Sequence, residues 1–87
     1  MTRETPRRRR EVLTRDLGNE IVIHDAANGN VHVLNETARE VFLACDGTLD
    51  RSQLAALLAD LYSIAAQEAE RDVAMILDHL REIGAID

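Results

Sequence analysis

Three histidines and one cysteine are the residues of this 87-residue chain with the most obvious chemistry. Imidazole nitrogens and thiolates bind metals and transfer protons, but a metal site needs several of them together. His24, His32 and His79 fall in separate predicted elements and have no ligand spacing. Cys45 lies on an apolar helical stripe without a neighbouring base, so we expect a small buried hydrophobic residue. We therefore predict no metal, no cofactor and no catalytic residue.

Composition limits the fold and the location of the chain. Apolar residues make up 46% of it, but the only aromatic residues are Phe42 and Tyr62, so the core must be aliphatic. A single cysteine excludes an internal disulfide. No apolar run approaches the roughly 18 residues that span a bilayer, and the N-terminus lacks a secretory signal. We expect a cytoplasmic protein without membrane contact.

The net charge of −6 is distributed unevenly along the chain. Residues 1–10 contain five arginines against Glu4, whereas residues 11–87 contain five arginines against fifteen acids. We expect residues 1–10 to form a disordered basic arm, followed by one domain of residues 11–87. The acidic body would repel phosphates, so we predict no nucleic-acid partner; the Arg7–Arg10 run could bind an acidic partner, nucleic acid or nothing.

Three short stretches rich in β-branched residues predict an antiparallel meander over residues 11–16, 20–24 and 30–34, with turns at residues 17–19 and 25–29. Side-chain alternation places Val31 and Val33 on one face of the third strand, and His32 and Leu34 on the other. This last strand leaves one edge of the sheet open, and it has no Lys, Pro or bulge to protect that edge.

Helix signals follow the strands. Asn35 is a predicted N-cap for a helix to about Cys45, and Asp46-Gly47 ends it. Asp50 and Gln53 form a predicted capping box for a second helix, and the third spans about Gln67 to Ile83, with Gly84 after it. Three strands followed by three helices predict an α+β fold that is winged-helix-like.

The string Val31-His32-Val33-Leu34-Asn35-Glu36-Thr37-Ala38, followed by Asp46-Gly47-Thr48 and a Leu-rich helix, resembles the PqqD family. The ending from Asp72-Val73 through Leu77 and Leu80 to Gly84 is also similar to that family. The resemblance covers roughly residues 11–87. It implies a non-enzymatic adaptor that binds the leader of a ribosomally made precursor peptide and presents it to a modifying enzyme, often a radical S-adenosylmethionine enzyme.

The resemblance also implies where the peptide binds: as an added strand on the third strand, in a groove shared with the third helix. The expected site residues are Val31, His32, Val33, Leu34, Asp72, Met75, Ile76 and His79. The opposite flank of that helix, with Glu70, Ala74, Leu77 and Arg81, stays open as an alternative. The same strand could instead be covered by the arm or by a second copy, so we expect a monomer or a strand-swapped homodimer.

Two other classes of function compete with the adaptor. A winged-helix DNA-binding transcriptional regulator would need cations on a recognition helix, and the last two predicted helices offer only Arg51, Arg71 and Arg81 among many acids. A small hydrolase or transferase would need a nucleophile with its base, or a phosphate loop, and the sequence contains neither.

Overall fold

The structure, a computed structural model, describes residues 4–25 and 28–87. Its elements are three strands, β1 (Val12–Asp16), β2 (Ile21–Asp25) and β3 (Asn30–Leu34), and three helices, α1 (Glu36–Ala44), α2 (Arg51–Tyr62) and α3 (Ala66–Glu82). This order confirms the predicted α+β class. Its likeness to a winged helix stays a prediction.

The sheet is an antiparallel meander in the order β1-β2-β3. Ile21 pairs with Leu34 and Ile23 with His32, so these side chains share the inner face of the sheet. The first turn is closed by Leu17 N–H, which donates to Glu20 O, and Gly18 adopts a φ of +95° there. Residues 26 and 27 of the predicted second turn lie outside the described residues.

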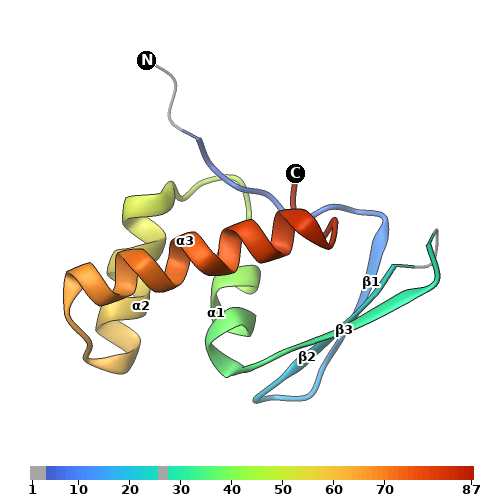
Figure 1. The fold of residues 1–87 in the computed structure, drawn as a ribbon, viewed down its shortest axis with the longest axis horizontal. Helices are drawn as coiled ribbons and strands as arrows, with labels where there is room; N and C mark the ends of the chain where they lie inside the picture. Colours follow the sequence, from blue (N-terminus) through green and yellow to red (C-terminus); the bar gives the residue numbers. More distant parts are fainter. Residues whose placement is uncertain (1–3, 26–27) are drawn as a thin grey trace.

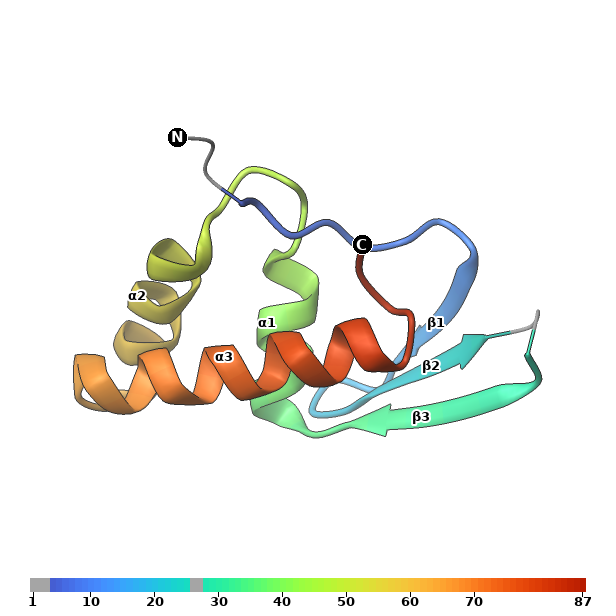
Figure 2. The same cartoon turned by 45° about the horizontal axis from the view of Figure 1, so that its top comes forward.

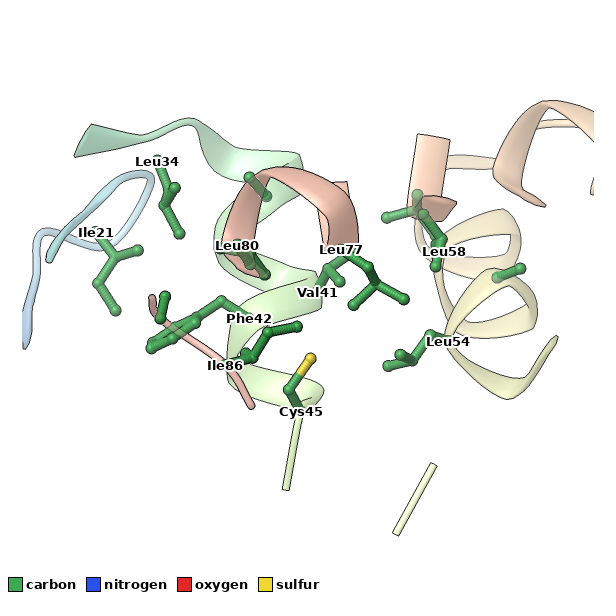
Figure 3. Close-up of a cluster of buried hydrophobic side chains, with 14 of the residues drawn as sticks. Ile21, Leu34, Val41, Phe42, Cys45, Leu54, Leu58, Leu77, Leu80 and Ile86 are labelled. Carbon is green, nitrogen blue, oxygen red and sulfur yellow. The ribbon is translucent and has the colours of Figure 1, made fainter. Parts of the chain in front are cut away.

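The sheet lies at one end of the molecule and α2 at the other, with α1 and α3 between them (Figures 1 and 2). The inner face of the sheet contributes Ile21 and Leu34 to the core, where they lie close to Phe42 of α1 and Leu80 of α3 (Figure 3). Leu54 and Leu58 of α2 close the other end of this aliphatic core. One continuous core therefore holds the sheet against the helices.

The predicted helix ends are confirmed by their hydrogen bonds. Asn35 Oδ1 accepts from Ala38 N–H at 2.9 Å and caps α1. Asp50 and Gln53 form both hydrogen bonds of a capping box at the start of α2. Gly84 has a φ of +75° directly after the C-cap of α3, a conformation that favours glycine. Asn35 therefore marks the end of β3 and Gly84 the end of α3, and both of these elements border the site described below.

Residues 4–10 belong to the predicted basic arm and make long-range hydrogen bonds in the structure. Arg8 N–H donates to Cys45 O at 2.9 Å and Arg9 N–H to Ala85 O at 3.0 Å, so the arm lies between the end of α1 and the C-terminal tail. Figure 1 shows this segment passing beside the C-terminus. The Arg8 side chain donates to Phe42 O and Leu43 O, two carbonyls in the last turn of α1. These partners lie far away in the sequence, so no local pattern indicates the contacts.

The outer face of the sheet is unusually apolar for a surface open to water. Leu13, Val31 and Val33 point outward and are 61%, 60% and 58% exposed. The predicted alternation along β3 is therefore confirmed: Val31 and Val33 are exposed, whereas Leu34 is buried on the inner face. Antiparallel sheets usually carry polar residues on their solvent face, so the apolar outer face of this sheet is unusual. It adjoins the open edge of β3.

Candidate functional site

A groove lies between the open edge of the sheet and the last helix. Its apolar end is a hollow of about 450 Å³ where the end of β3 meets α3. The residues around it come from β3, the start of α1 and the middle of α3: Val33, Leu34, Asn35, Thr37, Ala38, Asp72, Met75, Ile76 and His79. Figure 2 shows β3 as the sheet edge that runs beside α3. The groove thus combines an open strand edge with an amphipathic helix.

Most of the predicted site residues meet in this groove. Val33, Leu34, Asp72, Met75, Ile76 and His79 all line it. The other two β3 residues do not: His32 borders a separate hollow under the sheet, and Val31 borders a shallow hollow on the outer face. A peptide paired with β3 would still contact the backbone of both, because strand pairing uses main-chain groups.

The structure places Glu70, Ala74 and Leu77 of the alternative flank of α3 away from β3. Leu77 is buried in the core, and Glu70 and Ala74 line a hollow against the start of α2. Arg81 differs from these three residues: it lines a second hollow together with residues of β3, and it forms an ion pair with Glu4 of the arm. The flank with Asp72, Met75 and His79 is therefore the one that faces the open strand, and Arg81 is already engaged by a carboxylate that a DNA phosphate would have to displace.

Sequence reasoning missed the contribution of α1 to the groove. Asn35 was interpreted only as a cap, yet it lines the groove together with Thr37 and Ala38. The position of these residues in the sequence could have indicated their role. The chain enters α1 directly after Leu34, and the first turn of a helix lies next to the strand that precedes it. Leu34, Asn35, Thr37 and Ala38 therefore line the groove, and Asn35 also caps the helix.

The chemistry of the groove suits the binding of an extended peptide. Met75 is 70% exposed at its rim, and a flexible thioether adapts to different apolar partners. Asp72 is the carboxylate on the lining. β3 pairs with β2 alone among the described residues, so alternate N–H and C=O groups along its other edge remain available to an added strand.

The residues with metal-binding or nucleophilic chemistry do not converge. His24, His32 and His79 border three different hollows, and within residues 4–25 and 28–87 no group of His, Cys, Asp and Glu is placed to hold a metal ion. Burial raises the pKa of the Cys45 thiol to about 11, so the side chain stays a protonated, apolar core residue at neutral pH. None of the helices in the described part of the chain is long and apolar enough to cross a membrane.

Comparison with known proteins agrees with this geometry. The sequence model of the family described as "Coenzyme PQQ synthesis protein D (PqqD)" matches residues 20–86. No curated protein matches the chain. Two solved structures have the same fold, each with a TM-score of 0.83.

The first of these structures is described as "TbiB1 in Complex with the TbiA(beta) Leader Peptide"; it is 15% identical, and the alignment covers 93% of this chain and 94% of that one. The second is "Lasso peptide synthetase B1 complexed with the leader peptide"; it is 25% identical, with 95% and 98% covered. Each relative is thus a leader-peptide complex whose chain is matched over nearly its whole length.

Proposed function

The chain belongs to the PqqD family, and on that premise we propose that it is an adaptor that binds the leader of a ribosomally made precursor peptide. The leader adds to β3 as a fourth strand, and its inward side chains enter the groove beside α3. The support is the open β3 edge next to an exposed, apolar groove lined by Met75 and Ile76. Two structural relatives with leader peptides in their descriptions support the same ligand class.

Strand addition divides the work between backbone and side chains. The main-chain groups of Val31–Leu34 supply affinity for any extended peptide, and the groove supplies specificity through alternate side chains. The adaptor itself catalyses nothing in this proposal. By holding the leader beside a bound enzyme, it turns the encounter between enzyme and core peptide into an intramolecular event at high effective concentration.

The enzyme partner in this proposal is a radical S-adenosylmethionine enzyme, and the reaction takes place in the cytoplasm, where the precursor is synthesised. The adaptor acts as a monomer or as a strand-swapped homodimer. In the dimer, a second copy and the leader would compete for the same backbone groups on the open edge of β3.

The test is a titration of isotope-labelled protein with a synthetic candidate leader peptide, in which the backbone amide shifts of the protein are measured. Shifts concentrated on Val31–Leu34 and on Asp72–His79 support the proposal. In a matched series of the same peptide, each member carries a single N-methylated backbone amide, and its position moves by one residue from member to member. Strand addition predicts that affinity falls at every second position, because only alternate amides face β3. Uniform tolerance of N-methylation would rule out strand addition.

A further inference from the structure

A second hollow lies farther along the same line between β3 and α3. It has a volume of about 490 Å³ and lies under the inner face of the sheet, at the end where β2 turns into β3. β3 contributes Asn30 and His32 to it, and the end of α3 contributes Arg81 and Glu82. In contrast to the apolar groove at Leu34, its lining is mostly charged and polar. The two hollows therefore offer different chemistry to the same bound strand.

The spacing along β3 relates these hollows to one another. Asn30, His32 and Leu34 are two residues apart, so all three point to the inner face. A strand added to β3 has inward side chains with the same period. The side chain opposite Leu34 meets the apolar hollow, and the side chain opposite Asn30 lies four residues away along the peptide, at the charged hollow.

The charges around the second hollow favour a cation. Its two arginines already have carboxylate partners, since Arg9 lies 3.7 Å from Glu11 and Arg81 is paired with Glu4. Glu82 is exposed and forms no ion pair with any residue that the structure describes. A basic side chain entering this hollow would thus meet the carboxylate of Glu82, which has no cationic partner among the described side chains.

We propose, on the basis of the function above, that the second hollow is a specificity subsite for a basic residue of the leader. The leader then contains an apolar residue, three residues of any type, and a lysine or arginine. The apolar residue comes first, because the leader runs antiparallel to β3, as the two existing strand pairs do. Glu82 is the residue that selects the cation.

The experiment starts from a displayed library of random 12-residue peptides selected on the immobilised full-length chain. Peptides recovered by the wild-type protein are expected to be enriched in an apolar residue followed, four positions later, by lysine or arginine. One recovered peptide is then synthesised with that basic residue replaced by glutamate, and again with it shifted by one position. Each change is expected to lower the affinity about threefold to fivefold, the size of a single exposed charge pair.

Charge reversal in the protein identifies the selecting residue. Glu82→Lys is expected to abolish the preference for lysine over glutamate, whereas Asp60→Lys, the same charge change on an exposed site of α2, should retain it. Recovered peptides that shift the amides of β3 but lack the four-residue spacing, or that keep their preference on the Glu82→Lys protein, would overturn the subsite alone. Failure to recover any peptide that shifts those amides would overturn strand addition itself, and the subsite with it.

Discussion

The side chain of Arg7 lies against the backbone of Gly47, in the loop that follows α1. A Cβ atom on Gly47 would stand only 2.7 Å from Arg7 Nε and 2.8 Å from one of its terminal nitrogens. Gly47 also has a φ of +88°, and its N–H donates to Pro6 O at 3.0 Å. The Asp46-Gly47 turn therefore requires glycine for its positive φ, and a Cβ there would also displace the flexible end of the Arg7 side chain.

Gly47→Ala is expected to destabilise the protein by about 1–2 kcal/mol, because a left-handed φ is strained for alanine. Gly84→Ala is the matched control: its φ is +75°, but a Cβ there would meet nothing within 4 Å. The excess loss at Gly47 over Gly84, measured by urea unfolding, should disappear in an Arg7→Ala background. An equal loss in the free energy of unfolding at both glycines would show that the Arg7 side chain moves aside without destabilising the protein.

Arg8 stabilises the end of α1. Its guanidinium donates to Phe42 O at 3.3 Å and to Leu43 O, and it lies 6.0 Å from the centre of the Phe42 ring. Arg8→Ala should lower the free energy of unfolding by about 1 kcal/mol, since it removes a C-terminal cap and a cation–π contact. Arg10→Ala, which removes an exposed arginine of the same run, should change it by less than about 0.5 kcal/mol. Equal effects in urea unfolding would mean that the arm is held by its backbone alone.

Asp16 and Arg39 link the sheet to α1 and make stability depend on pH. Arg39 Nε and one terminal nitrogen donate to the two carboxylate oxygens of Asp16 at 2.8 and 2.7 Å. These bonds, with one from Gly18 N–H, hold the pKa of the Asp16 carboxyl below its ordinary value. A lowered folded-state pKa contributes stability that is present above the unfolded-state pKa and is lost as the pH falls through the folded-state pKa.

Asp16→Asn should therefore lower the melting temperature at pH 7 and flatten its decline on acidification. Asp60→Asn, on an exposed carboxylate of α2 that has no ion pair within the described residues, is the control. Thermal unfolding from pH 7 to pH 2 measures both. If Asp16→Asn and the wild type decline in parallel, the ion pair does not contribute to the acid sensitivity.

Met75 provides a test of the groove that does not depend on stability. Because it is 70% exposed, Met75→Ala should leave the free energy of unfolding within about 0.5 kcal/mol of the wild type. It should weaken leader binding about tenfold, since its apolar surface is buried only in the complex. Leu61→Ala, which truncates a side chain 51% exposed on α2, is the control and should keep the wild-type affinity. Calorimetric titration that shows equal affinities for both variants would place the leader elsewhere.

The sequence alone determined the elements and their ends, because the signals that determine them act within a few residues. Asn35 bonds to an N–H three residues ahead, Asp50 and Gln53 close a capping box, and Gly84 permits the turn after α3. The alternation that puts Leu34 inside and Val33 outside is likewise a property of any strand.

Tertiary structure alone decided which surfaces meet. Helical periodicity gives the angle between Met75 and Ala74 around α3 but not the neighbour that either side chain faces, so only the packed fold brings Met75 to β3. The arm is joined to the rest of the chain by hydrogen bonds such as the one from Arg7 N–H to Asp87 Oδ1, which spans 80 positions of sequence and which no local pattern contains. The groove has the same origin, because its walls come from β3, α1 and α3, and only long-range burial brings these segments together.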